Sequence, residues 1–131
     1  MKAFLDTHVL VYWLQGDERL LPRQSEVLEA ASPDEPLWVS DITLWEIAML
    51  VSLGRLSVDR PLRDWLEAAV APPLVRRVSV SPSVAAEVAS LPADFHKDPA
   101  DRIIVASART VAARLLTLDE RIIRSGCVPT L

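Results

Sequence analysis

Short apolar runs alternate with amphipathic segments along the whole chain. The apolar runs lie between polar or turn-forming residues and predict four strands, at residues 2–5, 37–39, 72–80 and 115–116. Apolar residues at helical spacing predict six helices, at residues 7–15, 22–31, 41–54, 61–70, 82–90 and 99–113. A further helical turn is expected to start near residue 119, and a final edge strand within residues 127–131.

Capping residues support the boundaries of two of these helices. Ser40 precedes the helix at residues 41–54 as a good N-cap, and Gly54 stands where that helix should end. Asp98 and Pro99 form a helix-start signature, with Asp at the cap and Pro at the first helical position. Both helices therefore have a local reason to begin where the hydrophobic pattern changes.

The alternation of strands and helices predicts an α/β fold. The chain has 131 residues, no internal repeat and no Gly/Ser-rich linker, so we expect one domain over residues 1–131. Strands that are separated by helices pair in parallel, and parallel sheets are covered on both faces. We therefore predict a mainly parallel central sheet that is flanked by helices on both faces.

The composition is that of a protein with an aliphatic interior. Half of the residues are hydrophobic but only 5% are aromatic, which suits helices packed on a sheet. Cys127 is the only cysteine, so an internal disulfide and a thiolate zinc cluster are excluded, and a reducing cytoplasm fits best. Asp6 and His8 interrupt the apolar N-terminal run, which argues against a signal peptide, and no run approaches the roughly 20 apolar residues of a membrane span. We expect a cytoplasmic protein without membrane contact.

Four acidic residues fall where an α/β fold places its functional site, which is beyond the carboxyl ends of the strands. Asp6 and Asp119 directly follow predicted strands. Asp101 lies in the first turn of one predicted helix, and Glu46 lies about two turns into another. Each aspartate is, by itself, also an ordinary helix-start residue. Glu46 is harder to explain in this way, because an unpaired carboxylate in an apolar helix would be destabilising.

Carboxylates crowded at one edge repel one another unless a cation lies between them. Oxygen donors from Asp and Glu suit Mg²⁺ or Mn²⁺, and two histidines with one cysteine are too few for a typical zinc site. Such ions activate water and stabilise the leaving oxygen of a phosphodiester. The four acids therefore indicate a divalent-metal nuclease.

The formal net charge of −4 argues at first against a nucleic-acid partner, because affinity for a polyanion comes largely from Lys and Arg. If the four acids and their neighbour Asp98 hold metal, the removal of five negative charges turns −4 into +1 for the remainder. The net charge therefore does not decide whether the protein binds nucleic acid.

Four segments of the sequence resemble one known family. They read LDTHVLVYW (residues 5–13), SDITLWEIA (40–48), HKDPADRIIVASA (96–108) and LLTLDERI (115–122). In this order and spacing they resemble the PIN-domain nucleases, and within them the VapC-type toxins of type II toxin–antitoxin modules. The resemblance covers nearly the whole chain.

The resemblance implies a small PIN-fold endoribonuclease that requires Mg²⁺ or Mn²⁺ and hydrolyses RNA. Its acidic quartet maps onto Asp6, Glu46, Asp101 and Asp119, with Asp98 as a fifth ligand or a helix cap. The resemblance also implies a homodimer and a small DNA-binding antitoxin, whose tail lies in an apolar groove of the toxin.

Polar residues beside the acids are candidates for supporting roles. Thr7, Ser40 and Thr117 flank the acids, and we expect them either to hydrogen-bond the carboxylates or the scissile phosphate, or to cap helices. His96 is expected to orient its loop or a carboxylate rather than act as a general base, because metal-bound water needs no imidazole to become nucleophilic.

Basic and aromatic residues near these segments are candidates for RNA and partner contacts. Three basic residues on or near the site helix are candidates for RNA phosphate contact: Lys97, Arg102 and Arg109. Arg102 is equally placed to brace an acid, and Lys97 to be a solvated surface residue. Three tryptophans are candidates for partner contacts, with core packing expected for at least one of them: Trp13, Trp45 and Trp65.

Other protein classes fit the sequence less well. A phosphorelay receiver would have paired acids after its first strand and a lysine after a late strand, but Thr7 follows Asp6, and Lys97 precedes a helix. A phosphatase of the haloacid dehalogenase type would have a second Asp where His8 stands. Within the PIN family, a non-toxin nuclease of RNA processing and a catalytically silent interaction module are the alternatives, and the complete quartet weighs against the silent module.

Overall fold

The central sheet has four parallel strands in the order β3-β2-β1-β4. In this computed structural model, which describes residues 2–131, the strands are β1 (Ala3–Leu5), β2 (Leu37–Ser40), β3 (Val75–Val78) and β4 (Arg114–Leu116). Ala3 of β1 pairs with Leu37 of β2 on one side and with Arg114 of β4 on the other. The carboxyl ends of β1 and β4 therefore lie side by side.

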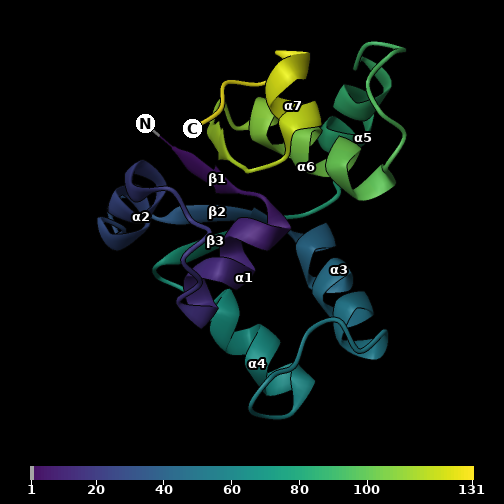
Figure 1. The fold of residues 1–131 in the computed structure, drawn as a ribbon. Helices are drawn as coiled ribbons and strands as arrows, with labels where there is room; N and C mark the ends of the chain where they lie inside the picture. The colour runs from purple at the N-terminus through teal and green to yellow at the C-terminus, as the bar shows by residue number, and fades with distance from the viewer. Residues whose placement is uncertain (1) are drawn as a thin grey trace.

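Helices cover both faces of the sheet (Figure 1). Within the described residues they are α1 (Thr7–Gln15), α2 (Pro22–Glu29), α3 (Asp41–Ser52), α4 (Leu62–Ala69), α5 (Pro82–Ala89), α6 (Pro99–Thr110) and α7 (Glu120–Ser125). Figure 1 shows α1, α2 and α4 on one side of the sheet and α5, α6 and α7 on the other, while α3 contacts both α1 and α6. No helix in this part of the chain is long and apolar enough to cross a membrane.

Alternate side chains of the strands build a core on each face. Ala3 and Leu5 of β1 pack into one cluster with residues of α1, α2, α3 and α4. Phe4, which lies between them, packs into a second cluster with residues of α6 and α7. Leu115 and Leu116 of β4 divide between the two clusters in the same way, because successive side chains of a strand point to opposite faces. The prediction of a parallel α/β sheet flanked on both faces is confirmed.

β3 and α6 differ most from the residue ranges that the hydrophobic pattern predicts. β3 covers Val75–Val78 instead of residues 72–80, because the prolines at the start of that run have no N–H group to donate to a neighbouring strand. α6 ends at Thr110 instead of residue 113, because Ala112 adopts a left-handed backbone conformation (φ 54°) that a right-handed helix cannot continue. Neither difference changes the order or direction of the strands.

The prediction of an edge strand within residues 127–131 is wrong. Within this segment only Thr130 forms a β-bridge, to Leu115 of β4. The carbonyl of Pro129 accepts from Leu115 N at 2.8 Å, and Leu131 N donates to Leu115 O at 2.9 Å. Pro129 has no N–H of its own, so the pairing cannot continue as a regular ladder. The C-terminal segment is therefore fastened to β4 at one residue without adding a strand.

Candidate metal centre

Asp6 stands at the junction of β1 and α1, at the carboxyl edge of the sheet. Its N–H donates to Leu116 O of β4 (3.0 Å), which continues the parallel pairing by one residue. Its buried side chain accepts from Thr7 N through Oδ1 (2.9 Å) and from the Thr117 hydroxyl through Oδ2 (2.6 Å). Two donors, one on each oxygen, therefore fix the orientation of this carboxylate.

Thr117 joins the ends of β1 and β4 through its buried hydroxyl. That hydroxyl donates to Asp6 and accepts from the backbone N–H of Asp119 at 3.0 Å. Asp119 is the N-cap of α7, and its Oδ1 accepts from Arg121 N at 2.9 Å. The two aspartates that follow strands are thus tied to the same threonine and lie at the same edge.

Gln24 of α2 supports this junction through hydrogen bonds that no pattern in the sequence predicts. Its fully buried side chain donates through Nε2 to Thr117 O (3.0 Å) and Leu131 O (2.8 Å). Its Oε1 accepts from Leu21 N at 3.1 Å. A buried amide needs all these partners, so Gln24 fixes the backbone at Thr117 and the C-terminal residue together.

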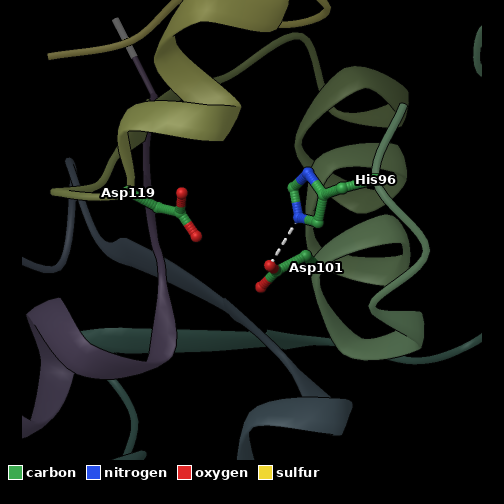
Figure 2. A group of neighbouring side chains, drawn as sticks. All are labelled: His96, Asp101 and Asp119. Carbon is green, nitrogen blue, oxygen red and sulfur yellow. Dashed lines mark hydrogen bonds and ion pairs between the residues drawn. The ribbon is translucent and has the colours of Figure 1, made fainter. Parts of the chain in front are cut away.

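Asp101 and His96 approach the same edge from α6 and the loop before it. His96 Nε2 lies 2.7 Å from Asp101 Oδ2, and the two side chains face Asp119 across the site (Figure 2). One ligand atom from each of these three residues lies within 4.8 Å of the other two. The expectation that His96 orients a carboxylate agrees with this contact.

Asp98 caps α6. Its Oδ1 accepts from Asp101 N at 3.1 Å, and its side chain is exposed. The structure therefore assigns a capping contact to Asp98 directly beside Asp101, and its charge lies close enough to raise the pKa of Asp101.

Glu46 leans from α3 over the same edge. Thr7 Oγ1 donates to Glu46 Oε1 at 2.5 Å and is also 2.9 Å from Thr43 Oγ1. The pKa of Glu46 is raised to about 7, mainly by burial and further by the negative charges of Asp6, Asp101 and Asp98, against the opposing effect of the Thr7 hydrogen bond. Glu46 therefore lies near Asp6, Asp101 and Asp98, although none of them is on the same helix.

The pKa values of Asp101 and Asp119 move in opposite directions. Burial raises the pKa of Asp101, as do the charges of Asp6, Asp98 and Asp119, whereas the His96 contact lowers it. Burial also acts to raise the pKa of Asp119, but the hydrogen bonds and charge of Arg121 outweigh it, so the pKa of Asp119 is lowered. The Arg121 contacts thus outweigh burial at Asp119, whereas the His96 contact does not outweigh burial and the neighbouring charges at Asp101.

These residues fit a hard divalent cation. The donors are carboxylate oxygens from Asp6, Glu46, Asp101 and Asp119, which is the ligand type that Mg²⁺ and Mn²⁺ prefer. The pKa values of Glu46 and Asp101 are raised because negative charges are held close together away from water. A bound cation would neutralise these charges. The Thr7 hydroxyl donates to Glu46 and the Thr117 hydroxyl donates to Asp6, which holds these two carboxylates in place.

The PIN domain family profile matches residues 3–126, which include all four acids. The chain belongs to the PIN-domain family. Ribonuclease VapC22 of Mycobacterium tuberculosis is 37% identical to it over 120 residues, which are 92% of this chain and 88% of that protein. The chain is thus similar to a VapC protein over almost its whole length.

Solved structures share the PIN fold of this chain. VapBC2 from Rickettsia felis, solved with a promoter DNA fragment, has a TM-score of 0.74 at 15% identity and covers 100% of this chain and 98% of its own. FitAcB from Neisseria gonorrhoeae has a TM-score of 0.70 at 22% identity, covering 98% and 96%. A toxin–antitoxin complex from Klebsiella pneumoniae has a TM-score of 0.66 at 19% identity, covering 97% and 95%. At these identities the likeness establishes the fold.

The remaining polar candidates of this PIN domain do not contact the four site carboxylates. Ser40 caps α3, since its Oγ accepts from Ile42 N at 3.1 Å. Arg102 donates to Phe95 O (2.6 Å) and His96 O (3.0 Å), so it braces the loop that carries His96 rather than an acid. Lys97 is an exposed loop residue. Arg109 is paired with Glu87 of α5 at 2.7 Å.

Arg121 and His8 also contact the site in ways that the sequence patterns do not predict. Arg121 of α7 reaches Asp119 Oδ2 (3.3 Å) and Asp101 Oδ2 (3.7 Å). His8 accepts from Leu118 N at 3.0 Å through Nε2, so its proton is on Nδ1, which lies 3.5 Å from Asp6 Oδ2. Both are ordinary residues within the resembling segments, and only the folded arrangement brings them against the acids.

The tryptophans of this PIN domain divide between core and surface. Trp13 and Trp65 are partly buried and pack against the first core cluster, so core packing is the role of these two. Trp45 is 57% exposed on α3, where Met49 and Leu53 follow it at spacings of four residues and are also exposed. α3 therefore presents an apolar stripe to solvent directly beside Glu46.

Replacement of Asp98 should separate its capping role from metal binding. Asp98→Ala is expected to lower the free energy of unfolding by about 1 kcal/mol, whereas Asp98→Asn should leave it unchanged, because Asn caps helices as well as Asp does. With a capping role alone, Asp98→Asn should change Mn²⁺ affinity by less than roughly tenfold. Denaturation and titration calorimetry measure both quantities. A loss of Mn²⁺ affinity equal to that of Asp101→Asn would instead make Asp98 a metal ligand.

Proposed function

We propose that this PIN-domain protein is a Mg²⁺- or Mn²⁺-dependent endoribonuclease that acts as the toxin of a toxin–antitoxin pair. The observation that carries the proposal is the approach of acids from four separate segments: in addition to burial, Asp6 and Asp101 raise the pKa of Glu46, and Asp6 and Asp119 raise that of Asp101. A fold gains no stability from such repulsion, so the arrangement favours a function that needs a bound cation. The name of the M. tuberculosis relative, a ribonuclease, supports RNA as the substrate.

In the proposed reaction the protein supplies position and charge. Divalent metal bound at Asp6, Glu46, Asp101 and Asp119 supplies water activation and charge neutralisation for hydrolysis of a phosphodiester. Thr117 and Thr7 hold Asp6 and Glu46 in place through short hydrogen bonds, and His96 does the same for Asp101. These neighbours fix three of the four carboxylates, which preorganises the site.

Removal of metal tests the catalytic part of the proposal. The purified protein should cleave single-stranded RNA when Mn²⁺ or Mg²⁺ is present, lose that activity in EDTA, and regain it when either ion is added in excess, because the donors are all oxygen. Gel analysis of the products measures cleavage. Freshly purified Asp6→Asn protein is the control for contaminating nuclease. Cleavage that persists in EDTA, or that the Asp6→Asn preparation also shows, would reject the proposal.

Expression of the protein alone tests the toxin part. The structural relatives include complexes described as toxin with antitoxin, which supports a small protein partner for this chain. The apolar stripe of Trp45, Met49 and Leu53 beside Glu46 is a surface that such a partner would cover. Induced expression in the bacterial cytoplasm should arrest growth, and the Asp6→Asn variant at equal abundance should not. Normal growth with active enzyme present would favour a housekeeping PIN nuclease of RNA processing.

A homodimer is the last part of the proposal. Size-exclusion chromatography with light scattering at micromolar protein concentration should give twice the 14.5 kDa mass of the chain. A monomer at that concentration would remove the dimer from the proposal and leave the catalytic part standing.

A further inference from the structure

A pocket of about 340 Å³ opens beside the metal centre, between α7 and the loop that precedes α6. Its walls include Asp94, Phe95 and His96 from the loop and Arg121, Arg124 and Ser125 from α7. We call it the α7 pocket. His96 and Arg121 belong to both places, because they contact Asp101 or Asp119 on one side and line the pocket on the other. Figure 2 shows how close His96 lies to the gap between Asp101 and Asp119.

The α7 pocket has a surplus of positive charge, in contrast to the acidic centre next to it. Its two arginines face one carboxylate, that of Asp94. Arg121 is shared with Asp119 and Asp101, but Arg124 forms no ion pair with any of residues 2–131 and is exposed. Most other arginines on the surface are paired with a neighbouring acid, as Arg77 is with Asp41.

A second cavity differs from the α7 pocket in its charge. A cavity of about 510 Å³ at the amino ends of β1 and β2 has Lys2 and Arg76 in its wall together with Asp34 and Glu35. Its charges balance, and it lies at the opposite ends of the strands from the acids. An anion that must also reach the metal centre therefore has one cationic pocket beside it, the α7 pocket.

We propose that the α7 pocket binds the phosphate of an RNA nucleotide that neighbours the scissile phosphodiester, with Arg124 as the principal donor. The inference rests on the proposed ribonuclease function. An RNA strand whose scissile phosphate lies at the acids must continue past them, and the next phosphate is repelled by any carboxylate charge that metal does not neutralise. A guanidinium offers two parallel N–H donors that match phosphate oxygens, and Arg124 is free to provide them.

Metal binding would strengthen the pocket for phosphate. Arg121 contacts Oδ2 of both Asp101 and Asp119, so a divalent cation held by these two carboxylates would compete with its guanidinium. With its carboxylate partners neutralised by a cation, the Arg121 guanidinium would be available to bind an anion in the pocket. The α7 pocket then holds two guanidinium groups for one phosphate.

The test is RNA binding by Arg124→Gln, measured apart from cleavage. The full chain carrying Asp6→Asn, which prevents turnover, is titrated with a fluorescein-labelled single-stranded oligoribonucleotide and followed by anisotropy at several KCl concentrations. Arg124→Gln should weaken binding roughly tenfold and reduce the slope of log K against log salt by about 0.7, the value for one lost phosphate contact on a single strand. Arg124→Lys should keep the slope and recover part of the affinity.

The matched control is Arg55→Gln, which removes the same charge from an exposed arginine in the turn after α3. It should leave both affinity and slope close to those of the parent. Equal RNA affinity and slope in Arg124→Gln and Arg55→Gln would overturn the pocket proposal. The same proteins are also titrated with an oligoglutamate peptide, and a loss of affinity for this peptide alone would overturn the proposal by indicating a protein ligand. Wild-type cleavage is measured in parallel: if it is present in Mn²⁺, such results reject the pocket alone, and if it is absent, the ribonuclease proposal itself fails.

Discussion

Replacement of Asp101 with asparagine should lower metal-dependent RNA cleavage by roughly 10³-fold or more while the fold stays intact. Asp101 is buried at the first turn of α6, where its Oδ2 meets His96 and its N–H is capped by Asp98. Asparagine keeps the size and the backbone contact, but it removes the charge that would bind a cation. Single-turnover cleavage in saturating Mn²⁺, with Mn²⁺ affinity measured by calorimetry, separates loss of metal from loss of chemistry.

The control for Asp101→Asn is Asp64→Asn. Asp64 also lies in the first turn of a helix, α4, so both substitutions remove one carboxylate from the positive end of a helix dipole. Asp64 is exposed, and it contributes to none of the site contacts described above. Asp64→Asn should therefore cleave as the wild type does. Full activity in Asp101→Asn, with the protein folded by circular dichroism, would remove Asp101 from the metal centre.

The parts of the site that follow directly from strand ends were predictable from the sequence. Asp6 and Asp119 each come after a short apolar run, and parallel strands end at a common edge. For that reason the Asp6 carboxylate and the backbone N–H of Asp119 both bond to the Thr117 hydroxyl. Glu46 was predictable in a different way, because a carboxylate in an apolar helix requires a partner, and the Thr7 hydroxyl is that partner in the fold.

Contacts between residues far apart in the chain were not predictable. Gln24 looks like any polar residue in the first turn of a helix, yet it bonds to Leu131 and Thr117, 107 and 93 residues away. The β-bridge of Thr130 and the Arg121 contact to Asp101 likewise depend on how α7 and the C-terminal segment pack. Local patterns carry propensity and periodicity, whereas these partners are selected by tertiary packing.

Replacement of Glu46 with glutamine should stabilise the metal-free protein and strongly weaken its metal binding at the same time. The pKa of Glu46 is about 7 in the folded protein, against an ordinary value of 4.5, because of burial and the charges of Asp6, Asp101 and Asp98. Between these two values the folded state binds more protons than the unfolded state, so the free energy of unfolding falls as pH rises. Allowing for screening of this partly exposed carboxylate, Glu46 should destabilise the metal-free protein by about 1–2 kcal/mol above pH 7.

Glutamine removes the charge and still offers Oε1 to the Thr7 hydroxyl, so Glu46→Gln should unfold at higher denaturant concentration than wild type at about pH 8 and at the same concentration near pH 4. The slope that remains in the variant belongs mainly to Asp101, whose pKa is raised by burial and by its acidic neighbours. Wild-type Mn²⁺ affinity should rise up to about tenfold per pH unit below pH 7, since the cation displaces the Glu46 proton, and the variant should bind at least roughly 100-fold more weakly. Urea denaturation and calorimetry across this pH range measure both effects. If Glu46→Gln is less stable than wild type at pH 8, or binds Mn²⁺ equally well, then the carboxylate repulsion that underlies the proposed metal centre is absent.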